Sequence, residues 1–556
     1  MHTARRIFIW LFSTEYGARN WLISRWLFLR SMGLIYFSAF FALLFQVKGL
    51  IGVHGLMPAV QYLEGGRNLG LMRFWAAPTL LWISSGNHML MGLMWAGLIA
   101  SVMLVANVWP RAMLAVCFVC YLSFVGAGQE FANYQSDGML LEAGFLSLFL
   151  APRGLMPGWG KQHPPMRAAI LLLLWEWFRI YFQSGVVKLA SGDPSWHNLT
   201  AMYEYYQNGP LPTWIGWYAE QMLPLGFQKF AAGATLVMEL VLVWLAFLPR
   251  PWRIACGVIV TVWQAGVIAT ANYAFLNYLV LVLGILLLDD QALRWMVPLR
   301  WRRGLPEAGE ATGPGLRDLL RAEEAPRLSV TSTEAASPRS EPLWAASRQA
   351  SVGWAVSAIL LTWIAYATTV PLIRMFVPEL PFPAAPIAAL EPFRIANQYG
   401  LFAVMTPHRY EIEFQGSNDG QTWTAYPFRY KPQDVHERPR IYAPYQPRFD
   451  WNLWFASLGS WIQDPLVPRT EEMLLENNAD VLGLFRGNPF ADAAPKYVRA
   501  VLYQYWFSTP KEKHSDGVWW RRELLGTYAP TLVRRPDGKL GVVAEPTLSG
   551  PPASAP

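Results

Sequence analysis

Long apolar segments fill most of the first 290 residues and constrain the fold of this 556-residue chain more than any other feature. A helix that crosses a bilayer needs about 20 mostly apolar residues. The windows that approach or exceed this length are 27–47, 87–108, 111–128, 137–152, 167–187, 230–248, 252–270, 272–288 and 352–373. The fourth window is short. We therefore expect an α-helical polytopic membrane protein with about eight to nine transmembrane helices, and we expect segment 71–84 to lie at the membrane interface.

The composition excludes most soluble classes of protein. Charged residues make up 15% of the chain, where a soluble domain usually carries about 25%. Hydrophobic residues reach 53%, and there are 28 Trp, a residue typical of membrane interfaces. The net charge of +7 fits basic cytoplasmic loops, and no basic stripe or nucleic-acid motif accompanies it. We expect no nucleic-acid partner.

The distribution of Lys and Arg predicts the orientation, because these residues concentrate in cytoplasmic loops. With a cytoplasmic N-terminus, the inside loops hold Arg111, Arg153, Lys161, Arg167, Arg250, Arg253, Arg294, Arg300, Arg302 and Arg303. The outside loops then hold Lys48, Arg67, Arg73, Lys188 and Lys229. An odd number of spans places everything after about residue 374 outside the cytoplasm.

Composition divides the chain into four parts. Residues 1–290 form the multi-span membrane domain, and 351–374 form the last transmembrane helix. Between them, 291–350 is predicted to be a disordered cytoplasmic linker, because most of it is rich in Gly, Pro, Ala, Glu and Ser. Residues 375–556 are predicted to form an extracytoplasmic, β-rich and β-sandwich-like soluble domain.

The β-rich prediction rests on local patterns in the C-terminal part. Residues 410–414 (YEIEF) alternate with period two, and Asn418-Asp419-Gly420 is typical of a hairpin turn. Segments 422–426 and 428–430 continue the pattern, so a β module is predicted over about 393–432. Another strand is expected at 495–507. Helical character is expected at 451–458, 471–475 and 479–484.

Sequence signatures of common catalytic sites are absent from the chain. It has no phosphate-binding loop, no nucleophile elbow and no zinc-protease motif. The eight His are scattered, without the i, i+3 or i, i+4 spacing of a metal site. The three Cys lie in apolar runs, so they predict no disulfide framework. We expect neither a metal nor a cofactor.

Ionisable side chains inside the apolar windows are costly in a membrane and therefore mark possible functional sites. Asp137 can cap the fourth window. Glu142, further along the window, either lines a polar cavity or pairs with a basic residue of a neighbouring helix. Glu176, Arg179 and Gln183 share one helix face, which favours a Glu176–Arg179 pair or a polar seam into the bundle.

Two further ionisable residues are Lys188, directly after the fifth window, and Glu239, in the middle of the sixth. Lys188 either snorkels to the membrane surface or acts as a desolvated base. Glu239 stands alone in the sixth window, where a structural partner is expected. If the chain is an enzyme, the catalytic candidates are Asp137, Glu142, Glu176, Arg179 and Lys188.

Four blocks in the same order resemble the lipase maturation factor family. They are SDGMLLEAGFLSLFLAP (136–152), GVVKLASGDPSWHNLTAMYEYYQNGPLPTW (185–214), MTPHRYEIEFQGSNDGQTWTAYPFRYKP (405–432) and RIYAPYQPRFDWNLWFASLG (440–459). The resemblance covers most of 20–290 and 390–530. The membrane half is also distantly similar to the membrane part of vitamin K-dependent γ-carboxylase and its bacterial relatives, the HTTM membrane domain.

The resemblance implies a setting and a role. Animal members of the family are endoplasmic reticulum membrane proteins that help dimeric secreted lipases to reach an active fold, and their C-terminal domain faces the lumen and contacts the client. This chain has few cysteines, which speaks against thiol exchange, and it ends PPASAP without a retention signal. We expect a bacterial inner-membrane protein with a periplasmic C-terminal domain, or an endoplasmic reticulum protein if the source is eukaryotic.

The resemblance favours a chaperone-like maturation factor, with membrane lipids and an exported, lipase-like client as partners. The aromatic residues proposed to contact the client, unless they form the core of the β module, are Tyr442, Tyr445, Trp451, Trp454 and Phe455. The alternative is a membrane enzyme that modifies a lipid or an exported protein in an intramembrane polar cavity. A transporter is disfavoured because no inverted repeat is visible. Segment 416–423 resembles a motif of discoidin-like β-sandwiches, which leaves sugar binding open.

Overall fold

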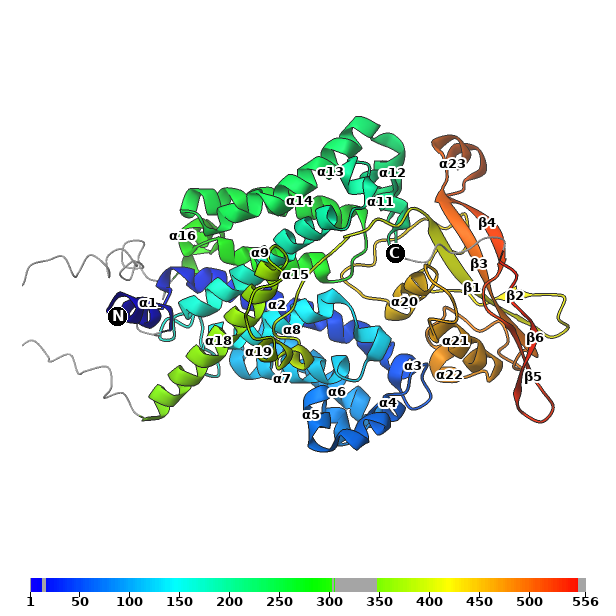
Figure 1. Cartoon of the computed structure of the whole chain (residues 1–556), viewed down its shortest axis with the longest axis horizontal. Helices are drawn as coiled ribbons and strands as arrows, with labels where there is room; N and C mark the ends of the chain where they lie inside the picture. The colour runs from blue at the N-terminus through cyan, green and yellow to red at the C-terminus, as the bar shows by residue number, and fades with distance from the viewer. Residues whose placement is uncertain (1, 13–16, 303–304, 306–347, 549–556) are drawn as a thin grey trace, which may run out of the picture.

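The computed structural model describes residues 2–12, 17–302, 305 and 348–548. Helices fill one side of the molecule and a β-sheet forms its opposite edge (Figure 1). The helices of the first 302 residues are α1 (His2–Phe12), α2 (Leu22–Leu44), α3 (Val47–Ile51), α4 (Ala59–Gly65), α5 (Arg73–Ala76), α6 (Asn87–Val105), α7 (Pro110–Val125), α8 (Gln135–Leu150), α9 (Arg167–Ala190), α10 (Pro194–His197), α11 (Met202–Asn208), α12 (Trp214–Met222), α13 (Leu225–Leu240), α14 (Arg250–Thr270), α15 (Leu276–Gly284) and α16 (Asp290–Leu293).

The described part of the chain contains six helices that are long and apolar enough to cross a membrane, or up to seven if one bent pair counts as a span. They run over Arg19–Leu44, Asn87–Val105, Arg167–Ala190, Leu225–Phe247, Arg250–Thr270 and Val352–Arg374, and the bent pair joins Leu276–Leu287 to Asp290–Met296. The expected eight to nine spans are therefore not confirmed. Helices α7 and α8 fall in predicted windows, but each has 16 residues, fewer than a bilayer usually requires.

The bundle is built around α2, α8 and α9. Helix α2 packs against α6, α6 against α7, α7 against α8, and α8 against α9, while α15 contacts both α2 and α9. Helices α13 and α14 lie further out, and only 33% and 22% of their apolar windows are buried in the protein. Their remaining apolar surface is what a lipid-facing helix presents.

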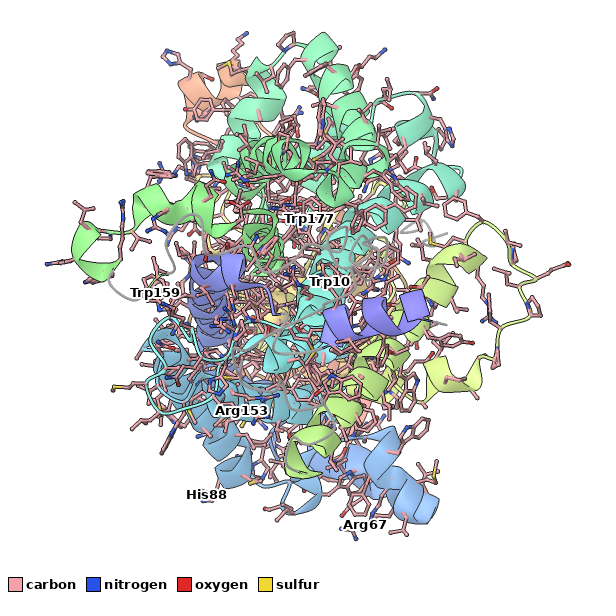
Figure 2. All side chains as sticks on the ribbon, turned by 90° about the vertical axis from the view of Figure 1, so that its left-hand side faces the viewer. Trp10, Arg67, His88, Arg153, Trp159 and Trp177 are labelled. Atoms are coloured by element: carbon pink, nitrogen blue, oxygen red, sulfur yellow. The ribbon has the colours of Figure 1, made fainter. Side chains whose placement is uncertain are left out.

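The end of the bundle remote from the sheet combines arginine side chains with tryptophan rings. The Arg30 guanidinium lies 4.7 Å from the centre of the Trp26 ring, and that ring lies 5.3 Å from the ring of Trp159. Figure 2 looks onto this end and labels Trp10, Arg153 and Trp159. Tryptophan and arginine are enriched where a membrane meets water, so this end has the character of an interface.

Two sequence predictions concern segments near the bundle. Segment 71–84 forms only short helical turns that expose Leu71, Phe74 and Trp75, and its place at the interface stays a prediction. The predicted linker 291–350 lies mostly outside the described residues. Its first residues form the short helices η7 (Arg294–Met296) and η8 (Leu299–Trp301), and its last residues begin α18 (Arg348–Arg374).

The C-terminal domain carries a six-stranded antiparallel sheet in the order β2-β1-β3-β5-β6, with β4 also paired to β3. The strands are β1 (Arg409–Ser417), β2 (Thr424–Ala425), β3 (Tyr497–Phe507), β4 (Trp520–Thr527), β5 (Thr531–Arg534) and β6 (Leu540–Ala544). The strands predicted at 410–414 and 495–507 are confirmed, and the predicted turn joins β1 to β2 through Gly420, whose φ is +73°. Such a φ favours glycine because it lacks a Cβ.

Helices, not a second sheet, cover the inner face of this sheet. They are α20 (Arg448–Ala456), α21 (Leu466–Leu475) and α22 (Ala479–Leu482), and they lie between the sheet and the membrane bundle (Figure 1). Helix α20 packs on β1 and α21 on β3. The expected sandwich is therefore wrong in the described residues, because amphipathic helices bury the apolar face of the sheet, including Ile412 and Phe414.

Candidate functional site

A buried arginine of the C-terminal domain pairs with an aspartate of the membrane bundle. The Arg448 guanidinium, at the start of α20, donates from Nη1 to Asp137 Oδ2 at 2.8 Å and from Nη2 to Asp137 Oδ1 at 2.7 Å. The Tyr121 hydroxyl donates to Asp137 Oδ1 at 2.6 Å and accepts from Arg448 at 2.9 Å. All three side chains are buried. Burial alone would lower the pKa of Arg448, but the Asp137 carboxylate raises it above its ordinary value, so the pair stays ionised.

A second cluster forms where residues 395–406, called here the strap, cross the end of α8 and α9. Arg179 of α9 pairs with Glu142 of α8. The strap completes this pair: the Asn397 backbone N–H donates to Glu142 at 2.9 Å, and the Tyr399 hydroxyl donates to Glu142 at 2.9 Å. Burial, and then the nearby carboxylates, raise the pKa of Tyr399 well above its ordinary value, so its hydroxyl remains a donor.

The third pair joins α9 to α13. Lys188 Nζ lies 3.0 and 2.9 Å from the two carboxylate oxygens of Glu239, and it also donates to the carbonyl of Leu401 in the strap at 3.0 Å. The rings of Trp196 and Phe402 lie within 6 Å of the ammonium. Lys188 is 2% exposed, so the interpretation that it snorkels to the surface is wrong. A charged partner inside the bundle holds it inward.

These contacts decide between several interpretations of the buried charges. Glu142 pairs with a basic residue of a neighbouring helix and Glu239 has a structural partner, as predicted. The predicted Glu176–Arg179 pair within α9 is wrong, because Arg179 turns to Glu142 of the adjacent helix instead. Glu176 is fully buried, and one of its carboxylate oxygens lies 3.4 Å from the Tyr399 hydroxyl.

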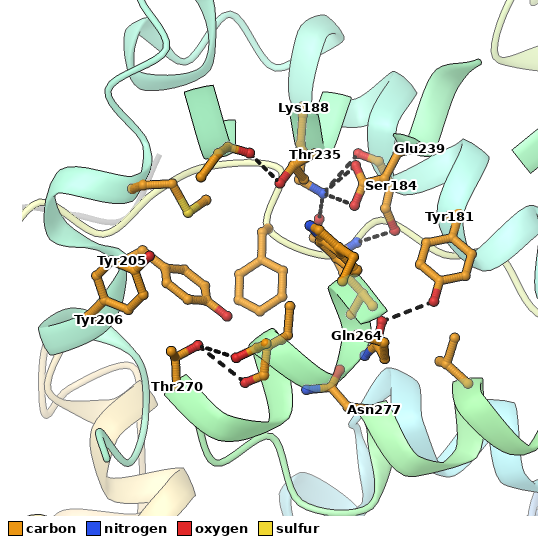
Figure 3. A pocket seen from close by; sticks show the side chains of 18 of the residues that line it. Tyr181, Ser184, Lys188, Tyr205, Tyr206, Thr235, Glu239, Gln264, Thr270 and Asn277 are labelled. Atoms are coloured by element: carbon orange, nitrogen blue, oxygen red, sulfur yellow. Dashed lines mark hydrogen bonds and ion pairs between the residues drawn. The ribbon is translucent and has the colours of Figure 1, made fainter. Parts of the chain in front are cut away.

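The five catalytic candidates do not form one shared site. Glu142, Glu176 and Arg179 come together under the strap, whereas Asp137 and Lys188 belong to separate pairs. Lys188 and Glu239 line a cavity of about 340 Å³ between α9, α13, α14 and α15 (Figure 3).

The aromatic residues proposed to contact a client divide by exposure. Trp451 and Trp454 are each 7% exposed and Tyr442 and Tyr445 are half-buried, whereas Phe455 is 47% exposed. The Trp451 ring packs on Tyr134 and Tyr273 of the membrane half. Most of this set therefore belongs to the interface between the two halves of the chain.

Comparison with known proteins identifies both halves of the chain. Residues 23–295 match the model of the lipase maturation factor transmembrane domain, and residues 395–530 match that of the lipase maturation factor C-terminal domain. The chain belongs to the lipase maturation factor family. It is 32% identical to lipase maturation factor 2 of Gallus gallus, over 95% of this chain and 82% of that protein. It is 31% identical to lipase maturation factor 1 of Bos taurus (93% and 90%) and 30% identical to that of Homo sapiens (92% and 88%). No solved structure matches the chain.

The sequence analysis did not identify the residues of the C-terminal half that pair with the buried charges of the bundle. These residues are Arg448, Asn397 and Tyr399. They lie outside the apolar windows, where a charged or polar residue does not by itself indicate a buried contact. Asn272, where the windows 252–270 and 272–288 meet, donates to the Arg440 carbonyl at 2.8 Å and accepts from the Tyr442 N–H at 2.7 Å. A polar residue in so short a turn could have indicated a docking contact.

Proposed function

We propose that this protein is a membrane-anchored maturation factor that assists the folding of exported lipases. Family membership over both domains supports the proposal, because the relatives are named for lipase maturation. The membrane half acts as a rigid base, and the C-terminal domain meets the client.

The pairing of buried charges is the observation that carries this proposal. Asp137 and Lys188 each bond to a residue of the C-terminal half, and Glu142 does so through the strap. A charge that is paired and desolvated in this way is costly to separate, so the bonds fix the domain on the bundle. A fixed domain presents the same surface to every client and loses little conformational entropy on binding.

The client would bind the exposed surface of the C-terminal domain beside α20. Phe455 of this helix is 47% exposed, with its ring 6.0 Å from that of Tyr134, and the half-buried Tyr442 and Tyr445 lie on the chain before it. Exposed aromatic rings are common anchors of protein interfaces. Trp451 and Trp454 would support this surface from beneath.

The setting we propose is a bacterial inner membrane, with a cytoplasmic N-terminus and a periplasmic domain that begins near residue 375. The basic residues at the end remote from the sheet support this orientation. Exported clients would then meet the sheet-bearing end of the protein as they leave the membrane.

The test is a deletion of the gene in its native host, followed by measurement of the activity per milligram of each secreted lipase. We expect specific activity to fall while lipase transcript stays level, and the wild-type gene to restore it. Complementation with Phe455→Ala should restore it only in part. Val542→Ala provides a control, since Val542 is 50% exposed on the distant strand β6. Unchanged lipase activity in the deletion strain would overturn the proposal.

The enzyme alternative rests on Lys188 and Glu239, which line a cavity. Their mutual pairing leaves neither side chain as a free base or acid, which weakens this alternative. A lipid or exported protein whose mass changes on deletion of the gene would favour the enzyme instead.

A further inference from the structure

The cavity beside Lys188 opens toward the lipid-facing side of the bundle. One face of α14 lines it through Val262, Gly266 and Thr270, and α13 lines it through Phe227 and Ala231. Val262 is 70% exposed and Phe227 is 46% exposed, so both walls reach the outer surface of helices that bury little of themselves in protein. A ligand can therefore enter sideways, between α13 and α14.

The interior of this cavity is apolar with a small polar floor. Rings and aliphatic side chains make most of its wall, as Figure 3 shows around Tyr205 and Tyr206. Its volume of about 340 Å³ falls in the range of ligand pockets, roughly 300–1,000 Å³. Its buried polar side chains include Lys188, Gln264 and Asn277, and the hydroxyl groups of Tyr205, Tyr206 and Thr270 lie elsewhere in the wall (Figure 3).

Most of these polar groups already have partners inside the protein. Lys188 is held by Glu239, and Gln264 Oε1 accepts from the Tyr181 hydroxyl at 2.9 Å. Asn277 differs: it is 5% exposed, and its Nδ2 has no hydrogen-bond partner among the residues that the structure describes. A buried amide donor without a partner is destabilising, and an acceptor on a ligand would remove that cost.

We propose that this cavity binds the acyl chain of a lipid, with its carbonyl oxygen accepting a hydrogen bond from Asn277. Three observations point to this class of ligand. The cavity lies among helices long and apolar enough to cross a membrane, its mouth reaches their exposed outer surface, and the Asn277 amide, unpartnered among the described residues, suits one uncharged or anionic oxygen. The paired Lys188 and Glu239 present no net charge, so the site selects no charged headgroup at this point.

Photolabelling of the full chain in membranes tests the proposal. The probes are phosphatidylcholine with a diazirine in its acyl chain and a free diazirine fatty acid. Adducts are mapped by mass spectrometry on peptides that contain Tyr181 and Asn277, which are at most 5% exposed and so do not meet bulk lipid. Adducts on α6 report ordinary contact with surrounding lipid and serve as the reference.

A matched pair of glycine variants separates cavity binding from surface contact. A Cβ added at Gly266, in the exposed α14 wall at the cavity mouth, or at Gly92, on the outer face of α6, meets no atom within 4 Å. We expect Gly266→Trp to lower labelling of the cavity peptides roughly tenfold, because the indole obstructs the mouth, and Gly92→Trp to leave it unchanged. Asn277→Leu should lower it about fivefold, the effect of one lost hydrogen bond.

The other outcomes identify the source of the lipid or contradict the proposal. Labelling by the phospholipid identifies a bilayer lipid as the source, and labelling by the fatty acid alone identifies a free acid. Cavity peptides that stay unlabelled by both probes, or that label equally in Gly266→Trp, overturn the proposal. Should Gly266→Trp fail to accumulate, Ala231→Phe on the opposite wall repeats the measurement.

Discussion

At the scale of single residues, Arg448 and Asp137 stand 311 positions apart and form a two-pronged buried ion pair. Removing the cation leaves a carboxylate in the protein interior without its partner. We predict that Arg448→Met lowers the free energy of unfolding by about 3–5 kcal/mol. Thermal unfolding in detergent, followed by tryptophan fluorescence, measures the loss.

A partly exposed pair in the same domain provides the control for this prediction. The side chains of Arg486 and Glu437 are 48% and 24% exposed and lie 3.1 Å apart, so Arg486→Met should cost no more than about 1 kcal/mol. Adding Asp137→Leu to Arg448→Met should recover part of the loss, since no unpaired charge then remains. Equal losses in Arg448→Met and Arg486→Met would contradict the assigned role of the pair.

Glu471 predicts a dependence of stability on pH. It is fully buried on α21, and burial raises its pKa well above the ordinary value. The folded state then holds this proton more tightly than the unfolded state, so Glu471 lowers stability as pH rises above the ordinary pKa of about 4.3. We predict that Glu471→Gln flattens this slope between pH 5 and pH 8, roughly. A parallel slope in the variant would show that another group causes the dependence.

At the scale of elements, helix α20 has a buried face and an exposed face. Trp454 is 7% exposed, and Phe455, the next residue, is 47% exposed. We predict that Trp454→Ala costs about 3–5 kcal/mol of stability, and that Phe455→Ala costs no more than about 0.5 kcal/mol. Phe455→Ala should nevertheless reduce the yield of active lipase. Unchanged lipase yield in a stable Phe455→Ala protein would remove this helix from the client surface.

Elements could be predicted where their signal is local. The apolar windows gave most membrane helices, and alternation over 410–414 gave β1, because hydropathy and period are properties of neighbouring residues. The short α7 and α8 show the limit of that reasoning. Each has only 16 residues, and α8 is mostly buried in the bundle, so packing inside the protein makes a window apolar just as contact with lipid does.

At the scale of the whole molecule, the site was only half predictable. The sequence marked Asp137, Glu142 and Lys188 as unusual, because charge in an apolar window is costly. It could not show that Arg448 and the strap satisfy them, since these segments lie more than 200 residues away and carry no pattern of their own. The spacing of Glu176 and Arg179 even suggested the wrong pair, because a neighbouring helix offered Arg179 a better-placed carboxylate.

The placement of the two ends of the chain predicts its orientation. Helix α1 and the sheet lie at opposite ends of the bundle (Figure 1), and we therefore predict that the chain crosses the membrane an odd number of times between them. Basic residues gather at the end that holds α1, among them Arg25, Arg253 and Arg300, and such residues mark the cytoplasmic side. A fusion of alkaline phosphatase after residue 556 should be active, and a fluorescent protein inserted within 306–347 should fluoresce. The opposite pattern would invert the molecule in the membrane and place the C-terminal domain beyond the reach of any exported client.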